Sequence, residues 1–198
     1  MTATARLRAA GLAVEILERR QGPVPLGGAS ADGGLSESLY TDPGELEIFL
    51  DQVVQDHPGI TRIEALGTTH EGRTIRGLMI SDNAATDEDE LTILLSGAHH
   101  AREVMTVEVV MDLIDHLTDN YGIDPEITAR VDTYQIWCVP MVNPDGVHRV
   151  FVVDDSWRKN LRDNDDNGTI TFDDGVDLNR NYEWGWGGQC GGSSGSLS

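Results

Sequence analysis

The segment GAHHARE carries a histidine and a glutamate three residues apart, His100 and Glu103. It follows an apolar run, LTILLS, and precedes a stretch with helical spacing of apolar residues. In open α/β sheets, ligands bind beyond the carboxyl ends of the strands. An imidazole and a carboxylate at this spacing can converge on one zinc ion, which takes three protein ligands in catalytic sites. The alternative is an exposed loop histidine and an ordinary first-turn acid near the helix dipole.

Two arginines follow later in the chain, Arg158 in WRKN and Arg180 in GVDLNRNY, the second preceded by Asn179. A guanidinium presents a planar fork of N–H donors that matches a carboxylate, and a fixed cation can also stabilise an oxyanion. These residues could therefore bind an anionic group. The alternative is that each arginine balances a neighbouring aspartate, because the surrounding region is very acidic.

The segment DNDDNGTITFDD, residues 163–174, has the spacing of a calcium-binding loop. The oxygen donors in this pattern are Asp163, Asp165, Asn167 and Asp174. Gly168 takes the turn position, and the last place holds an aspartate where a glutamate is usual. A pair of flanking helices is not evident, so an EF-hand is not predicted. Calcium binding and a solvated acidic turn are both open interpretations.

Hydrophobic spacing and turn residues predict the elements that position these side chains. The predicted helices run from Asp42 to before Pro58, over 102–122 and over 125–131. The predicted strands lie within 60–82, joined by a turn at 70–72, and over 91–97 and 133–142. The run 91–97 is continuously apolar, which is typical of a strand buried in a central sheet. The chain from Asn143 onward is expected to be loop-rich, and the order of elements indicates α/β layers.

The composition limits the partners of this chain. It has 34 acidic and 14 basic residues, a formal net charge of −20, which repels nucleic acid and anionic membrane surfaces. Its apolar runs are shorter than the roughly 20 residues that span a bilayer. We therefore predict neither a nucleic-acid nor a membrane partner. Of the two cysteines, Cys138 lies in an apolar run and Cys190 in GGQCGG, and a disulfide between them is neither supported nor excluded.

Four segments together, GAHHARE, VNPDG, WRKN and GVDLNRNY, resemble the zinc carboxypeptidases of the A/T type in order and approximate spacing, from about residue 40 to residue 182. The resemblance implies an α/β fold with a mixed, largely parallel central sheet flanked by helices, and an extracellular location. It makes His100 and Glu103 zinc ligands and Arg158 the cation near the scissile carbonyl. It also makes Asn179 and Arg180 the clamp for the terminal carboxylate of a peptide or protein substrate.

The same resemblance implies an incomplete active site within these 198 residues. In the family, the third zinc ligand and the glutamate general base come well after the NRNY segment, whereas the last histidine here is His148. We therefore expect weak zinc binding and no peptide hydrolysis from this chain alone. The alternatives are a non-catalytic protein that binds peptide carboxyl termini and a calcium-stabilised interaction domain.

Four segments are predicted along the chain. Residues 1–20 resemble the end of an activation propeptide, and residues 21–39, rich in Gly, Pro and Ser, indicate a linker. Residues 40–186 are expected to form the amino-terminal part of a carboxypeptidase domain. Residues 187–198 are expected to form a Gly/Ser-rich tail at its truncated end.

Overall fold

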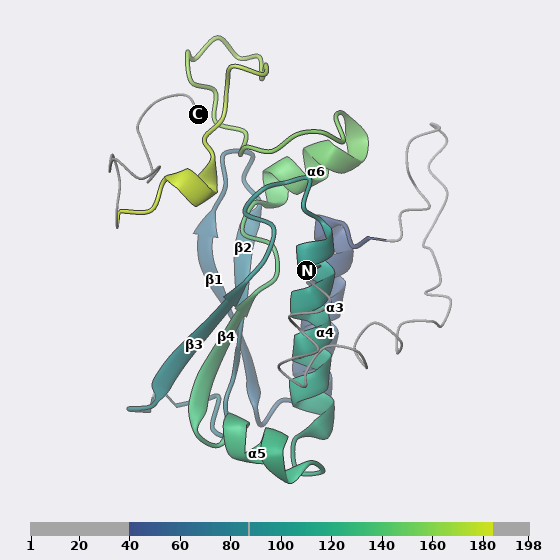
Figure 1. The fold of residues 1–198 in the computed structure, drawn as a ribbon, viewed down its shortest axis with the longest axis vertical. Helices are drawn as coiled ribbons and strands as arrows, with labels where there is room; N and C mark the ends of the chain where they lie inside the picture. Colours follow the sequence, from purple (N-terminus) through teal and green to yellow (C-terminus); the bar gives the residue numbers. More distant parts are fainter. Residues whose placement is uncertain (1–39, 87, 184–198) are drawn as a thin grey trace, which may run out of the picture. The chain divides into compact units, whose positions relative to one another are not determined.

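The computed structural model describes residues 40–86 and 88–183 and is drawn as a ribbon in Figure 1. The propeptide remnant expected at 1–20, the linker at 21–39 and the tail at 187–198, which contains Cys190, lie outside the described residues. Cys138 is buried and free, and burial raises the pKa of its thiol to about 12. The described helices include none that is long and apolar enough to cross a membrane.

The four described strands form one mixed sheet in the order β1-β2-β4-β3. Their bounds are β1 Thr61–Thr68, β2 Thr74–Ile80, β3 Leu91–Ser96 and β4 Tyr134–Val139. β2 is antiparallel to both β1 and β4, whereas β3 and β4 are parallel. The expected α/β fold with a mixed sheet and helices is confirmed, although this part of the sheet is less parallel than the resemblance implied.

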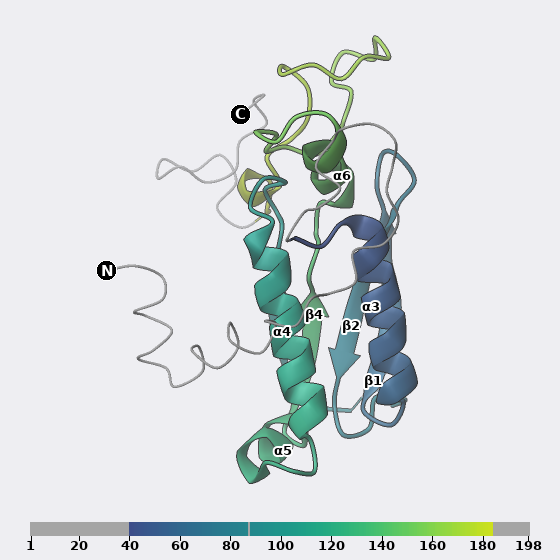
Figure 2. The ribbon, with the colours of Figure 1, turned by 90° about the vertical axis from the view of Figure 1, so that its right-hand side faces the viewer.

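The helices pack on the sheet and at its ends. Their bounds are α3 Pro43–Asp56, α4 Met105–Asn120, α5 Pro125–Val131 and α6 Pro144–Val152, followed by a 3₁₀ turn, η1 Leu178–Arg180. Figures 1 and 2 show α3 and α4 side by side against one face of the sheet, and α5 and α6 at opposite ends of it. The core between them includes Leu50 of α3, Leu78 of β2 and Ile114 of α4, all fully buried. This core fixes the end of β3, which His100 and Glu103 follow in the chain.

The first predicted helix is confirmed as α3, and its sequence explains where it begins and ends. The Asp42 carboxylate accepts the Glu45 N–H and the Glu45 carboxylate accepts the Asp42 N–H, each at 2.9 Å. This capping box satisfies two N–H groups that the helix itself leaves without acceptors, and Pro43 has no N–H to satisfy. The helix ends at Asp56, shortly before Pro58, because a proline disfavours helical backbone in the residue before it.

The structure contains one helix that the sequence analysis missed, α6, within the stretch expected to be loop-rich. The Asn143 side chain accepts the Gly146 N–H at 3.1 Å, and Pro144 occupies the first turn, which are regular signals of a helix start. The helix contains a glycine and several valines, so local propensity does not favour it. Burial of Val147 against the core overrides that preference.

The turn between β1 and β2 is tied to the start of α6. Asp145 is buried, and its carboxylate accepts hydrogen bonds from the Thr69 hydroxyl at 2.8 Å, the Glu71 N–H at 3.0 Å and the Arg73 guanidinium at 2.8 Å. A buried carboxylate is costly unless it is paired in this way. The contact therefore holds the hairpin turn predicted at 70–72 against the end of the sheet where the candidate site lies.

The expected burial of residues 91–97 in the middle of a sheet is wrong for the described part of the chain. β3 lies at the edge of the described sheet and pairs with β4, and its Leu91 and Leu94 are 75% and 64% exposed. The continuous apolar run is typical of a strand with neighbours on all sides. Within the described residues no strand covers its outer edge, so the run forms an uncharged apolar edge of the kind that pairs with other chains.

We expect the exposed edge of β3 to promote self-association. Leu94→Lys places a charge on this edge without emptying the core, so it should reduce association while leaving the melting temperature nearly unchanged. Sedimentation velocity over a concentration series measures the association. Ile48→Lys is the matched control, because Ile48 is 72% exposed on α3 and receives the same charge. Equal effects of both variants would attribute association to net charge rather than to β3.

Candidate metal and carboxylate site

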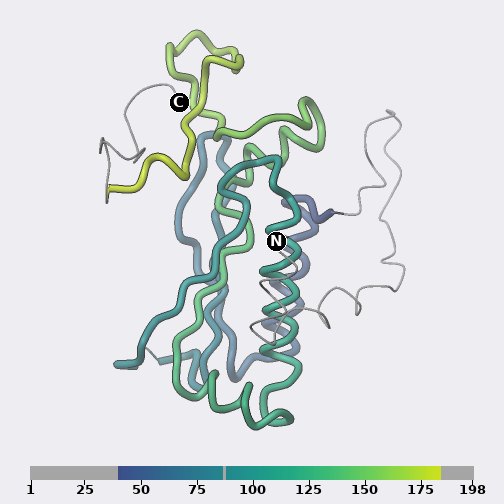
Figure 3. The backbone as a smooth tube through the Cα atoms, viewed as in Figure 1, coloured from purple at the N-terminus to yellow at the C-terminus, as the bar shows by residue number. Residues whose placement is uncertain are grey.

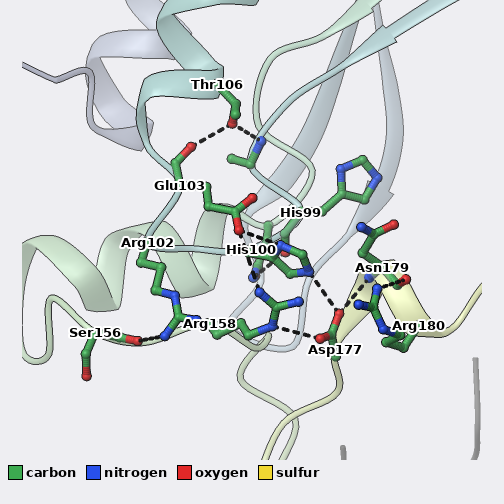
Figure 4. A network of polar contacts seen from close by, with 12 residues as sticks. His99, His100, Arg102, Glu103, Thr106, Ser156, Arg158, Asp177, Asn179 and Arg180 are labelled. Atoms are coloured by element: carbon green, nitrogen blue, oxygen red, sulfur yellow. Dashed lines mark hydrogen bonds and ion pairs between the residues drawn. The ribbon is translucent and has the colours of Figure 1, made fainter. Parts of the chain in front are cut away.

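The loop after β3 carries the predicted pair of metal-ligating side chains (Figure 4). The His100 side chain is buried, and its Nδ1 lies 2.9 Å from Oε1 of Glu103. The backbone turns sharply just before it at Ala98, whose φ of 48° is in the left-handed region that a non-glycine residue seldom adopts. The Ala98 N–H donates to the Thr106 hydroxyl at 2.8 Å, which fixes the loop to the start of α4.

A second carboxylate, Asp177, contacts this imidazole, and the sequence analysis gave it no role. Asp177 precedes η1 and is buried, and its Oδ1 lies 3.1 Å from Nε2 of His100. Its Oδ2 accepts a 2.8 Å hydrogen bond from Nε of Arg158. The aspartate in GVDLNRNY could have indicated this contact from the sequence. A histidine that binds a metal through one ring nitrogen generally donates the N–H of the other to a carboxylate or carbonyl.

Arg158 links the two carboxylates of this network. Its Nη1 lies 3.6 Å from Oε1 of Glu103, and its carbonyl accepts the Ala101 N–H at 3.0 Å. Burial alone would raise the pKa of Asp177, but the hydrogen bond and charge of Arg158, with a contribution from His100, outweigh burial and lower it. Asp177 is therefore ionised at neutral pH and holds both partners in place.

The donor atoms of the pair fit a zinc ion. A neutral imidazole carries one N–H, so when Nε2 donates to Asp177, Nδ1 directs its lone pair toward Glu103. A cation between the nitrogen and the carboxylate oxygen would satisfy both. Within residues 40–86 and 88–183, groups of three or more metal-ligating side chains occur at Asp82, Glu88 and Glu90 and at Asp163, Asp165 and Asp174. Neither group includes His100 or Glu103, so the described residues bring two predicted zinc ligands together rather than three.

The VNPDG segment holds the loop after β3 and the Arg158 loop together. The buried Asn143 side chain donates to the His99 carbonyl at 3.3 Å and to the Lys159 carbonyl at 3.0 Å. A Cβ added to Gly146 would lie 2.7 Å from that Lys159 carbonyl oxygen, closer than real Cβ atoms come to backbone. Glycine is therefore required where these segments cross.

The predicted carboxylate clamp follows Asp177 directly, in η1. The Asp177 Oδ1 atom accepts the Asn179 N–H at 3.0 Å and so caps the turn. Asn179 and Arg180 are exposed, and Nη1 of Arg180 donates to the Asn179 carbonyl at 2.9 Å. Figure 4 shows both residues beside Asp177. The carboxylate that orients His100 therefore also begins the turn that carries the clamp.

His99 points away from its neighbour, as expected for adjacent residues at a strand end. Its Nε2 lies 2.5 Å from the Tyr182 hydroxyl, and the two ring centroids are 5.9 Å apart with the planes tilted by 50°. Burial lowers the pKa of His99, and the adjacent His100 lowers it further. The neutral ring can accept the tyrosine O–H. His99 is therefore directed to Tyr182, which follows the predicted clamp residues, and away from the predicted zinc ligands.

The acidic segment before η1 forms a closed loop, visible in the trace of Figure 3. The predicted calcium donors in it are Asp163, Asp165, Asn167 and Asp174. The three carboxylates offer oxygens within 4.8 Å of one another, and Asn167 donates to Asp165 instead of presenting a free amide group. Backbone N–H groups of Gly168 and Thr171 donate to Asp163 and Asp174, which lowers the pKa of both carboxyls. The three predicted carboxylate donors therefore lie close together, and calcium binding stays a prediction.

Comparison with known proteins gives one family. A family model described as zinc carboxypeptidase matches residues 46–198. The chain is 43% identical over 140 residues to a zinc carboxypeptidase of Saccharothrix mutabilis subsp. capreolus, covering 70% of this chain and 31% of the relative. It is 33% identical over 122 residues to an inactive metallocarboxypeptidase of Saccharomyces cerevisiae, covering 61% of this chain and 28% of the relative.

The fold is similar to that of a carboxypeptidase A from Helicoverpa armigera, with a TM-score of 0.64 and 26% identity. That similarity covers 75% of this chain and 35% of the insect protein. The chain therefore spans about a third of the length of each of these proteins. Because one relative is inactive, similarity by itself does not assign catalysis.

We expect Asp177→Asn to lower the free energy of unfolding by about 1–3 kcal/mol, because one amide oxygen cannot serve both His100 and Arg158. Urea unfolding followed by circular dichroism measures the change. Asp173→Asn is the control, since Asp173 is an exposed aspartate of the same acidic stretch, and it should cost less than about 0.5 kcal/mol. Unchanged stability of Asp177→Asn would show that this network does not hold the loops together.

Proposed function

This chain belongs to the zinc carboxypeptidase family, and on that premise we propose that it supplies the zinc-binding pair and the carboxylate clamp of a peptidase that hydrolyses the carboxyl-terminal peptide bond. The observation that carries this proposal is the contact of one buried carboxylate, Asp177, with His100 at 3.1 Å and Arg158 at 2.8 Å. The same residue caps the turn that carries Arg180. Metal-ligating and carboxylate-recognising groups are thereby held in one network.

In the proposed reaction, His100 and Glu103 would hold a zinc ion, which would act as a Lewis acid on the scissile carbonyl and would activate a water molecule. Asp177 accepts the Nε2–H of His100 and keeps Nδ1 directed at the metal position. Arg158 is held through Nε by Asp177, and its terminal N–H groups, of which Nη1 lies 3.6 Å from Glu103, would stabilise the oxyanion that develops at the attacked carbonyl. One carboxylate therefore orients both groups before substrate binds.

Asn179 and Arg180 are proposed to bind the free carboxylate of a peptide or protein substrate. A guanidinium fork and an amide N–H match the two oxygens of a carboxylate, and both side chains are exposed to an incoming ligand. The formal charge of −20 disfavours nucleic acid as an alternative anionic ligand. An extracellular location is proposed from the family resemblance alone.

We expect purified residues 1–198 to bind zinc weakly and to release no terminal amino acid from blocked dipeptides. A catalytic zinc site needs three protein ligands, and the described part of the chain brings only the two predicted ones together. Competition with a chromogenic chelator measures zinc affinity, and an amine-release assay measures hydrolysis. His100→Ala should weaken zinc binding further, whereas His116→Ala, on α4, should not. Rapid zinc-dependent hydrolysis would refute the inactivity of this chain and leave the family assignment intact.

The clamp is tested with a matched pair of ligands, an N-acetylated dipeptide with a free carboxyl terminus and its carboxyl-terminal amide. We expect the acid to bind about tenfold more tightly, because the amide lacks the charge that pairs with Arg180. Arg180→Ala should abolish this preference, whereas Arg130→Ala, on α5 at the other end of the sheet, should preserve it. Equal binding of acid and amide to the unmodified chain, measured by NMR titration, would contradict the proposed clamp.

A further inference from the structure

We propose that His99 and Tyr182 are positioning residues for the carboxylate clamp, a role that rests on the function proposed above. The hydrogen bond between Nε2 of His99 and the Tyr182 hydroxyl, 2.5 Å long, joins the loop after β3 to the residues that follow Arg180. The zinc pair and the clamp do not explain this contact, because neither of its partners is a predicted ligand or clamp residue. It is a second connection between two segments already joined through Asp177.

Two adjacent histidines hold the two ends of the clamp segment, residues 177–182. His100 contacts Asp177 at the beginning of the segment at 3.1 Å, and His99 contacts Tyr182 at its end at 2.5 Å. The clamp residues Asn179 and Arg180 lie in the chain between these contacts. Their side chains are exposed, so the position of the segment has to be set by what lies on either side of it.

The backbone at His99 is a fixed support for such a connection. The preceding Gly97 donates to the Val139 carbonyl at 3.0 Å and accepts the Val142 N–H at 3.1 Å. A Cβ added at Gly97 would lie 2.6 Å from the Pro140 carbonyl oxygen, which shows how closely the two segments pack. The His99 carbonyl itself accepts the buried Asn143 side chain. The His99 imidazole therefore extends from backbone that hydrogen bonds fix at the end of β3, not from a freely moving loop.

The clamp gains from a second anchor because η1 is short. It has three residues, and the Asn181 N–H reaches the Leu178 carbonyl at 3.4 Å, a long hydrogen bond. A segment held at Asp177 alone would have to order Asn179 and Arg180 when a ligand binds, and that loss of freedom weakens binding. With Tyr182 also held, the Arg180 guanidinium is oriented before the ligand binds. The contact should therefore affect ligands that use the clamp more than ligands that do not.

The test compares the dipeptide acid and amide described above on the full 198-residue chain. Tyr182→Phe keeps the ring and removes the hydroxyl, so binding of the acid should weaken about three- to tenfold while binding of the amide stays unchanged. His99→Ala should give the same loss, and His99→Gln should restore part of it, because its amide can bond to the hydroxyl. Tyr134→Phe, at the opposite end of β4, is the control and should have no effect.

Hydrogen exchange gives a readout that needs no ligand. In Tyr182→Phe the N–H groups of Asn179 to Asn181 should exchange faster, while those of α4 should exchange as before. An unchanged acid preference and unchanged exchange in Tyr182→Phe would overturn the positioning role and leave the clamp intact. Equal binding of acid and amide to the unmodified chain would instead overturn the clamp, and with it this proposal.

Discussion

Ionic and hydrogen-bonded pairing of the buried Asp177 is the interaction on which the candidate site depends. A carboxylate removed from water is costly unless its oxygens have partners, and here His100 and Arg158 take one oxygen each. The dependence is mutual. The Asp177 carboxylate fixes the His100 ring and the Arg158 guanidinium, and these two groups keep the carboxylate ionised. Residues from three distant parts of the chain are thereby set in one geometry, and the arrangement tolerates little change at any of them.

Much of this architecture could be predicted from the sequence where local chemistry decides it. The capped start of α3, the hairpin of β1 and β2, and the helix and strand around the crossover follow from spacing and turn residues. The pairing of His100 with Glu103 follows from their separation of three residues. The motifs also predicted roles for Arg158 and Arg180, and the structure shows that Arg158 contacts Asp177 and that Arg180 lies in the turn that Asp177 caps.

What could not be predicted depends on contacts between distant segments. Leu94 is exposed because the described sheet has no strand beyond β3. An apolar run does not indicate from sequence alone whether its strand lies at the edge or in the middle of a sheet. The helix α6 forms because Val147 packs in the core, although local propensity does not favour it. The positive φ of Ala98, which costs on the order of 1 kcal/mol, persists because Gly97 before it and the His99 carbonyl after it are both fixed by hydrogen bonds. That turn gives adjacent histidines different partners.

The parallel pairing of β3 with β4 has a consequence for how the molecule folds. The chain must complete the crossover through α4 and α5 before these strands can meet. The site contacts span still more sequence, 77 residues from His100 to Asp177 and 83 from His99 to Tyr182. Because local contacts form sooner than distant ones, the helices should form early and the site should close last. A ligand that recognises the closed site would then oppose unfolding of the whole domain, and its binding should be visible as greater global stability.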